Sequence, residues 1–366
     1  MIISMQRGRL RAWMLRAAQA AGLALAAGAC AAQAPQIGVY YYSGWKSGQV
    51  GNPYQQPWNA IKPYGDRQPM LGYYAEDGAG VMASQLNWMR GAGIDYVVFG
   101  HFWGADGRAY LDHGIRAYTR LSTSNAVRFA LMWPNHSNAM LTQANLAKMF
   151  ATIATTYMRR ADYVRIDGKP MLVIFSAPKF AENARALGMT SAQLVALADG
   201  EARKVGLPGM ALVGGMWGGD STFDYSSRSG FAAWTAYNYH GPVQPYGPDG
   251  RIVSRSYAEL DRGYRSQWAW LLANTSQPLL MPMTSGWDRR PWGGSTDPLH
   301  DLSRSTPAEF LAHLRAARTV MAQNPVRTRF GGIVCCWNEY GEGSFIEPTK
   351  AGGTRHIDQV RASFAP

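Results

Sequence analysis

Two glutamates three positions apart offer the clearest chemistry in this sequence. Glu339 and Glu342 lie in a polar loop rich in glycine, directly after the apolar run of residues 333–337. Carboxyl groups at this spacing can share one small site, and cleavage of a glycosidic bond needs such a pair, one protonated and one ionised. The same spacing also fits two glutamates on a solvated loop or at the cap of a helix. Spacing alone leaves both interpretations open.

The residues around the pair form a longer motif. Residues 337–348 spell W-N-E-Y-G-E-G-S-F-I-E-P. This segment resembles the signature W-N-E-x-x-E-G-x-x-I/L-E-P of glycoside hydrolase family 99 and of the related WbsX-like proteins. The resemblance implies that Glu339 and Glu342 are the catalytic pair, with Glu342 as general acid/base. It also implies that Glu339 acts on the sugar 2-hydroxyl and that the anomeric configuration is retained. Family 99 often has Trp-His between the glutamates, where this chain has Tyr340 and Gly341.

The elements that would position the pair alternate along the chain. Eight short apolar runs predict buried strands at residues 37–42, 94–99, 129–132, 171–175, 210–214, 233–237, 279–283 and 333–337. Helical periodicity predicts helices at 79–90, 109–121, 143–159, 191–205 and 256–272, and a capping box starts another at Thr306. This alternation predicts an α/β fold, a (β/α)8 TIM barrel formed as a single domain by residues 35–366. The family resemblance implies the same fold.

Aromatic and polar residues recur just after the predicted strands. In a TIM barrel these positions share one face, so together they predict an aromatic-walled cleft suited to a sugar. Each of them alone also fits a structural role. Asp288 is the candidate for a third carboxylate that binds a sugar hydroxyl. We expect the loops 43–72 and 241–254 to set the specificity. The candidate substrate-binding residues are Tyr41, Tyr42, His101, Trp103, Trp133, Asn135, His136, Tyr237, His240, Trp287, Asp288 and Asn338.

The first 34 residues have the pattern of an export signal. Four arginines precede an apolar stretch at residues 17–29, which is too short to span a membrane as a mature helix. Residues 27–30 resemble a lipobox, in which Cys30 would carry a lipid, and residues 32–34 offer an alternative cleavage site. We therefore expect a bacterial protein in the periplasm, anchored at the outer membrane, or secreted. Cys30 would be its only attachment to a membrane.

Charge and cysteine content narrow the partners. The net charge is +12, and four positive charges lie in the predicted signal, which leaves +8 for the rest. Lys and Arg are dispersed along the chain, which favours a solvated basic surface, so we expect no nucleic-acid partner. An acidic polysaccharide partner is compatible with this charge.

The adjacent Cys335 and Cys336 are expected to be unbonded core residues. No Cys/His spacing indicates a zinc site, and we expect neither metal nor cofactor.

Three functions follow from these observations. The first is an exported glycoside hydrolase that cleaves a polysaccharide or glycan, endo-acting and retaining. The second is a WbsX-like glycosyltransferase in polysaccharide assembly. The export signal argues against it, and so does the lack of a glycine-rich phosphate loop and of an Asp-x-Asp pair. The third is a non-catalytic carbohydrate-binding barrel, for which a carboxyl pair would be unnecessary.

Export gives the first testable prediction. Fractionation of the native host should find the protein outside the cytoplasm, because the basic and apolar N-terminus directs it to the secretion machinery. Cys30→Ala should release it from membranes if Cys30 carries a lipid, whereas an unchanged distribution would indicate secretion without an anchor. Cytoplasmic protein that retains Met1 would contradict export.

Overall fold

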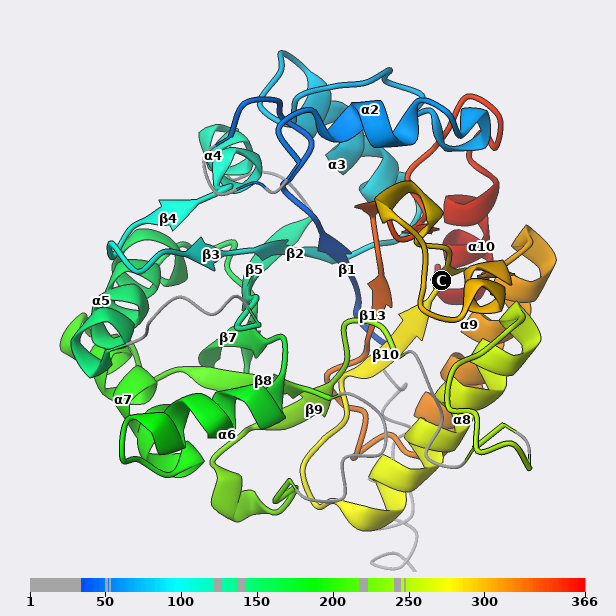
Figure 1. The fold of residues 1–366 in the computed structure, drawn as a ribbon. Helices are drawn as coiled ribbons and strands as arrows, with labels where there is room; N and C mark the ends of the chain where they lie inside the picture. Colours follow the sequence, from blue (N-terminus) through cyan, green and yellow to red (C-terminus); the bar gives the residue numbers. More distant parts are fainter. Residues whose placement is uncertain are drawn as a thin grey trace, which may run out of the picture. The chain divides into compact units, whose positions relative to one another are not determined.

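Eight parallel strands form the centre of the computed structural model (Figure 1). They follow one another around a barrel in chain order, and each predicted strand is present within a few residues of its expected position. Their runs of buried side chains, rich in Val, Ile, Leu and Met, suit strands that are covered on both faces. The strands are β1 (Ile37–Tyr41), β2 (Tyr96–Gly100), β5 (Arg128–Trp133), β7 (Lys169–Ile174), β8 (Ala211–Gly215), β9 (Ala233–Thr235), β10 (Met281–Thr284) and β13 (Gly332–Cys335).

The structure describes residues 34–365 with several gaps. The predicted export signal, with Cys30, lies outside the described residues, and so does His240. Within the described part, no helix is long and apolar enough to cross a membrane. The gaps are residues 50, 51, 53, 122–126, 137–141, 217–222, 240–244 and 247.

The pairing of strands closes the barrel. β1 lies between β13 and β2, with Val39 opposite Val334 on one side and Val97 on the other. Between β9 and β10 the circle is completed by a parallel bridge at Trp234. The Trp234 N–H donates to the Pro278 carbonyl at 2.9 Å, and the Trp234 carbonyl accepts from the Leu280 N–H at 2.9 Å. The predicted TIM barrel is therefore confirmed.

Helices surround the strands (Figure 1). The predicted capping box is present at the start of α9, where Thr306 and Glu309 each bond the other's backbone N–H. The α-helices are α2 (Pro57–Ile61), α3 (Val81–Gly91), α4 (His113–Arg120), α5 (Gln143–Ile153), α6 (Ala177–Ala186), α7 (Ser191–Lys204), α8 (Tyr257–Asn274), α9 (Pro307–Gln323) and α10 (Arg355–Phe364).

Two predicted helices differ in their bounds, and two further helices of ten residues each were not predicted. The helix expected at 109–121 begins only at His113, because Ala109–Tyr110 pairs as β4 with β3 (Phe102–Trp103). The helix expected at 143–159 ends as α-helix at Ile153 and continues as a π-helical turn. α6 and α10 were not anticipated, since each has only ten residues and a short apolar stripe.

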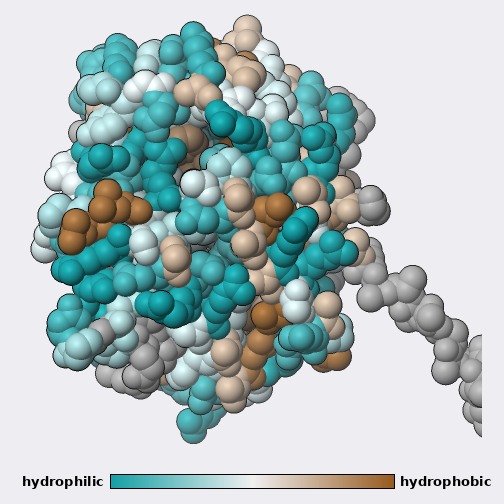
Figure 2. All heavy atoms as spheres, turned by 90° about the vertical axis from the view of Figure 1, so that its right-hand side faces the viewer, coloured by the Kyte–Doolittle hydropathy of each residue, from teal (hydrophilic) through white to brown (hydrophobic). Residues whose placement is uncertain are grey.

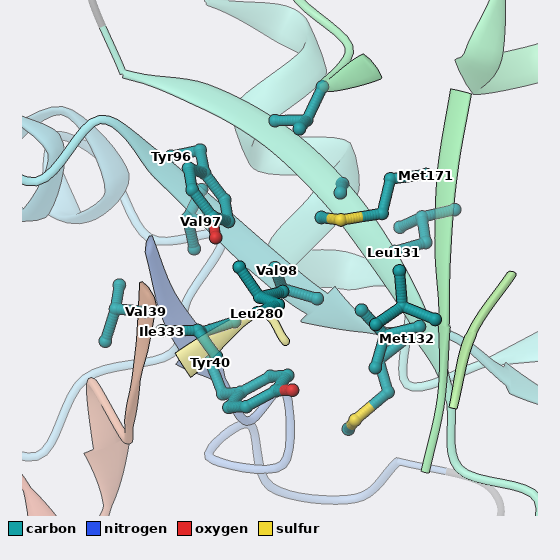
Figure 3. Packing of buried hydrophobic residues seen from close by; sticks show 14 of the residues in the cluster. Val39, Tyr40, Tyr96, Val97, Val98, Leu131, Met132, Met171, Leu280 and Ile333 are labelled. Atoms are coloured by element: carbon teal, nitrogen blue, oxygen red, sulfur yellow. The ribbon is translucent and has the colours of Figure 1, made fainter. Parts of the chain in front are cut away.

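The outside of the molecule is mostly hydrophilic where Figure 2 shows it, with apolar residues scattered among polar ones. The apolar side chains are instead gathered in the barrel. Figure 3 shows Tyr40, Val98, Met132, Leu280 and Ile333 packed together from five different segments. This core holds the strands whose ends carry the site.

A second apolar cluster lies under the loop that carries the glutamates. It consists mainly of aromatic residues, and Trp45 stacks on Trp58 with ring centroids 4.2 Å apart. Tyr340 and Phe345 belong to this cluster, so the segment between them is held at both of its ends by packing of their rings. The members are Trp45, Trp58, Ile61, Tyr74, Tyr340 and Phe345.

Cys335 and Cys336 form a disulfide at the end of β13. The expectation that they are unbonded was therefore wrong, although both are fully buried as predicted. A disulfide between adjacent cysteines is unexpected when the peptide bond between them is trans, as in nearly all residues. Here the peptide bond between the two cysteines is cis, and their Cα atoms lie 3.0 Å apart.

Candidate active site

A short hairpin after β13 carries the two glutamates. Its arms are β14 (Asn338–Glu339) and β15 (Ser344–Phe345), so Glu339 lies on a strand and Glu342 in the turn, where its N–H donates to the Glu339 carbonyl at 3.3 Å. Gly343 closes the turn with a φ of +70°, which favours glycine, and a Cβ there would lie 2.8 Å from the Cβ of Asp288. The turn thus packs directly against the segment after β11 (Gly286–Trp287).

The hairpin forms one wall of a cleft of about 670 Å³ at the carboxyl ends of the strands. This size and its aromatic lining are typical of small-molecule and sugar sites. Seven of the predicted site residues line it: Tyr41, Tyr42, His136, Tyr237, Trp287, Glu339 and Glu342. The structure adds others that the sequence analysis did not single out, namely Tyr54, Phe102, Tyr110, Leu111, Phe175, Asn238, Arg289 and Trp292.

Four predicted site residues lie behind the cleft, in the supporting structure. His101 is buried against Trp103, and its two ring nitrogens have no hydrogen-bond partner in the described chain. Burial lowers its pKa to about 4. Trp103 donates its indole N–H to Asn145, while Trp133 packs between Phe150 and Phe180. Asn135 exchanges two hydrogen bonds of 2.8 Å with the backbone of Ser176, which ties the end of β5 to the start of α6.

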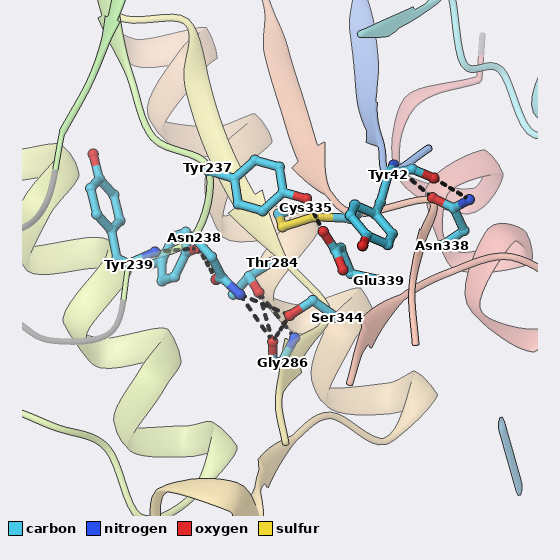
Figure 4. The surroundings of a disulfide bond; sticks show 12 residues. Tyr42, Tyr237, Asn238, Tyr239, Thr284, Gly286, Cys335, Asn338, Glu339 and Ser344 are labelled. Atoms are coloured by element: carbon cyan, nitrogen blue, oxygen red, sulfur yellow. Dashed lines mark hydrogen bonds between the residues drawn. A yellow bond between two sulfur atoms is a disulfide. The ribbon is translucent and has the colours of Figure 1, made fainter. Parts of the chain in front are cut away.

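Asn338 holds a neighbouring aromatic residue in place. Its side-chain oxygen accepts from the Tyr42 N–H at 2.9 Å, and its side-chain N–H donates to the Tyr42 carbonyl at 3.0 Å (Figure 4). Its own carbonyl accepts from the indole of Trp45 at 2.9 Å. Asn338 is fully buried and absent from the cleft lining, so it fixes Tyr42 beside the glutamates from behind.

The two glutamates have different surroundings. Tyr237 donates its hydroxyl proton to Oε1 of Glu339, as Figure 4 shows. The other oxygen of Glu339, Oε2, is buried without a partner among the described residues. The described residues therefore leave the hydrogen-bonding capacity of this oxygen unused. Glu342 is less deeply buried and lies near Arg289, which also lines the cleft.

Burial raises the pKa of both carboxyl groups. For Glu342 the pKa rises to about 7, although the positive charge of Arg289 pulls it down. For Glu339 burial raises the pKa well above its ordinary value, the charge of Glu342 adds to the rise, and the hydrogen bond from Tyr237 opposes it. Two carboxyl groups that influence each other in this way take up and lose protons as a pair. The raised pKa of Glu342 is the property that a general acid requires.

A third glutamate of the motif is structural. Glu347 is buried and accepts hydrogen bonds from Tyr74 at 2.6 Å, Gln85 at 2.8 Å and Tyr340 at 2.9 Å. Gln85 in turn accepts from the hydroxyl of Tyr41, which lines the cleft, at 2.9 Å. Burial raises the pKa of Glu347 to about 7. This network links the base of the hairpin to Tyr41 at the end of the neighbouring strand β1.

Asp288 is part of a buried ion cluster. It pairs with Arg67, which is also fully buried, and with Arg290 at 2.6 Å. Although burial raises the pKa of Asp288, the hydrogen bond from Arg290 and the charge of Arg67 hold it below its usual value. Both oxygens of Asp288 accept hydrogen bonds from arginines, and Asp288 is absent from the cleft lining. Its role in the fold is therefore to support the rim of the cleft.

In the described part of the chain, no group of three or more His, Cys, Asp or Glu side chains could hold a metal ion.

The fold is similar to the barrels of glycoside hydrolases. A structure described as a glycoside hydrolase-like protein is 15% identical with a TM-score of 0.67, and the match covers 90% of this chain and 94% of that one. The GH99 endo-alpha-mannosidase from Bacteroides thetaiotaomicron is 12% identical with a TM-score of 0.60, covering 90% of this chain and 96% of that one. At these identities the likeness concerns the fold.

The sequence family is more specific. Residues 62–360 match the model of the family described as glycosyltransferase WbsX, and the chain belongs to this family. None of the curated proteins is similar enough to count as a match.

The ion cluster gives a prediction that separates support from sugar binding. Asp288→Asn should lower the free energy of unfolding by about 3–5 kcal/mol, because it leaves the fully buried Arg67 without a counter-ion. Denaturant unfolding measures this. Asp66→Asn removes the largely exposed partner of Arg304 and serves as the control, with an expected cost below about 1 kcal/mol. Unchanged stability together with lost glycan binding would make Asp288 a sugar ligand instead.

Proposed function

We propose that this protein is an exported glycoside hydrolase that cleaves a polysaccharide or glycan within the chain and retains the anomeric configuration. The observation that carries the proposal is the placement of Glu339 and Glu342 at one aromatic cleft, close enough for the charge of one to raise the pKa of the other. A binding protein would gain nothing from two carboxyl groups that hold a proton near neutral pH.

In the proposed reaction Glu342 gives its proton to the glycosidic oxygen as the bond from C1 to that oxygen breaks. Glu339 takes the proton of the 2-hydroxyl, whose oxygen attacks C1 and forms a 1,2-anhydro sugar. Water then opens this ring at C1, with Glu342 accepting a proton from the water and Glu339 returning one to the 2-oxygen. The role of Glu339 comes from the family resemblance, and it is supported by the unpartnered Oε2.

The protonation of the pair is compatible with these roles. Without substrate, burial and the charge of Glu342 raise the pKa of Glu339 well above its ordinary value. A sugar hydroxyl that donates to Oε2 would replace part of the lost solvation and favour the ionised form. The proton needed for the leaving oxygen would then reside on Glu342, whose pKa is about 7.

Glycosyl transfer is the second candidate, because the family description names a glycosyltransferase. Both reactions break a bond at C1 and differ in what attacks it, water or an acceptor sugar. Incubation of the purified protein with a glycan panel, including α-mannan, in the presence and absence of nucleotide sugars distinguishes them. If products form only when a nucleotide sugar is present, the protein is a glycosyltransferase and the hydrolase proposal is wrong.

Exchanging each glutamate for glutamine tests the assignment. Glu342→Gln should keep fold and binding and lose roughly 10²–10⁴-fold in turnover, since it removes general acid–base help. The loss should be smallest on substrates whose leaving group needs no protonation. Glu339→Gln should be impaired on every substrate. Turnover like that of the wild type in either variant would contradict the assignment, and an inverted product would exclude the 1,2-anhydro route while leaving the pair intact.

The pH dependence follows from the raised pKa of Glu342. The active form has Glu342 protonated and Glu339 ionised, so kcat/KM should fall tenfold per unit above about pH 7 as Glu342 loses its proton. It should also fall toward acidic pH, because Glu339 then gains a proton. On a substrate with an activated leaving group the alkaline fall should be much weaker. Glu342 would not be the acid if kcat/KM already began to fall with rising pH near pH 4.5. The same would follow if the alkaline fall in kcat/KM were equal for the natural substrate and the substrate with an activated leaving group.

A further inference from the structure

The turn after β11 brings a cation and an aromatic ring to the cleft. Arg289 and Trp292 both line the cleft, and the Arg289 carbonyl accepts from the N–H groups of Trp292 at 2.9 Å and Gly294 at 3.0 Å. The Arg289 N–H donates to Asp301 at 2.9 Å, and Arg290 is held by Asp288. The backbone of this turn is therefore fixed at several points, so its two cleft-lining side chains start from a rigid base.

Arg289 differs from the arginines around it. Arg67 and Arg290 share Asp288, and Arg304 pairs with Asp66. Within the described ranges, the guanidinium of Arg289 donates only to the carbonyl of Gly294, at 3.1 Å, and it forms no ion pair with a carboxylate. It is also the only Lys or Arg among the described residues that line the cleft. A guanidinium in this state retains most of its donors for a ligand.

Trp292 takes the space of a missing side chain in the catalytic hairpin. A Cβ at Gly341 would lie 2.0 Å from the indole, so only glycine permits this contact. The indole also stacks on Tyr54, with centroids 4.7 Å apart and planes at 12°. Tyr54 and Trp292 thus form an aromatic wall that touches the loop between Glu339 and Glu342, and flat aromatic surfaces suit the apolar faces of sugar rings.

We propose that the cleft recognises a glycan with an acidic sugar, whose carboxylate or sulfate group binds Arg289 while its ring lies near Tyr54 and Trp292. The inference rests on the proposed glycan-cleaving function and names its substrate class. Guanidinium groups bind planar and tetrahedral oxyanions through paired hydrogen bonds. The charge of +8 outside the predicted signal would also attract an acidic polymer at long range.

The position of Arg289 supports this assignment over a purely electrostatic role. A cation beside a general acid favours loss of the proton, and Arg289 does lower the pKa of Glu342. A residue placed there only for acid catalysis would therefore work against it. An acidic group bound to Arg289 would neutralise the cation, so Glu342 would keep its proton to higher pH when the correct substrate is present.

The experiment measures binding by titration calorimetry in the Glu342→Gln background, which prevents turnover. The probes are hexasaccharides of a polyuronate and of a sulfated galactan, with a neutral α-mannan hexasaccharide as the reference. Acidic probes should bind, and Arg289→Gln should weaken them roughly tenfold to hundredfold while leaving the neutral probe unchanged. Arg289→Lys should restore part of the affinity. The stronger of the two acidic probes identifies whether carboxylate or sulfate is preferred.

Arg329→Gln is the matched control. Arg329 precedes β13 and pairs with the exposed Asp167 before β7, at the end of the barrel strands opposite the cleft. The substitution therefore removes one positive charge far from the cleft. It should leave all affinities unchanged. Thermal unfolding of each variant checks that the fold is kept. Equal weakening of acidic and neutral probes by Arg289→Gln, or the absence of binding to both acidic probes, would overturn the inference.

Activity separates this inference from the proposed function. With Glu342 restored, cleavage of neutral glycans alone would uphold the hydrolase and overturn the acidic substrate. Binding of acidic probes that depends on Arg289, without cleavage of any glycan, would uphold the acidic ligand and contradict the hydrolase. Where acidic glycans are cleaved, the alkaline fall in kcat should lie at higher pH than the fall in kcat/KM.

Discussion

One buried charge holds together the three segments that frame the cleft. Arg67 comes from the long loop after β1 and pairs with Asp288 after β11, and it also donates to the Tyr340 carbonyl in the hairpin that carries the two glutamates, at 2.7 Å. Burial lowers the pKa of Arg67 to about 10. Removing two charges from water costs much of what their attraction returns, so such a pair contributes little net stability compared with an apolar contact. What it does provide is geometry, because a fully buried guanidinium tolerates few other arrangements.

That geometry matters because the chemistry depends on how far each carboxyl group is withdrawn from water. Glu339 is deep and bonded by Tyr237, while Glu342 lies at the turn and faces Arg289. A small shift of the hairpin would change the solvation of both and with it their proton affinities. The second aromatic cluster under Tyr340 and the hydrogen bonds around Glu347 oppose such a shift from below. The site is thus held by neighbours that do not touch the cleft.

The sequence predicted the barrel because each strand is a short buried apolar run, a pattern that depends on local residues alone. It also placed the glutamate pair, which a contiguous motif carries. Asp288 was expected to bind sugar, yet it is enclosed by arginines, and one of these lies 221 positions away in the sequence. Tyr54, Arg289 and Trp292 were missed for the same reason, since only the folded chain brings the two loops together. The disulfide was missed because adjacent cysteines give no local signal of a cis peptide.

The contact between Gly341 and Trp292 restricts which residues the loops at the cleft can carry. The fold is shared with the family 99 enzyme at 12% identity, so most positions do not need a particular residue to keep the fold. The residues between the glutamates are less free, because a side chain at position 341 would collide with the indole. Gly341 and Trp292 therefore constrain each other across two loops. Because the turn that carries Trp292 also carries Arg289, the position of the aromatic wall and of the cation in the cleft depends on one segment. A larger residue at position 341 would displace the indole and so disturb both.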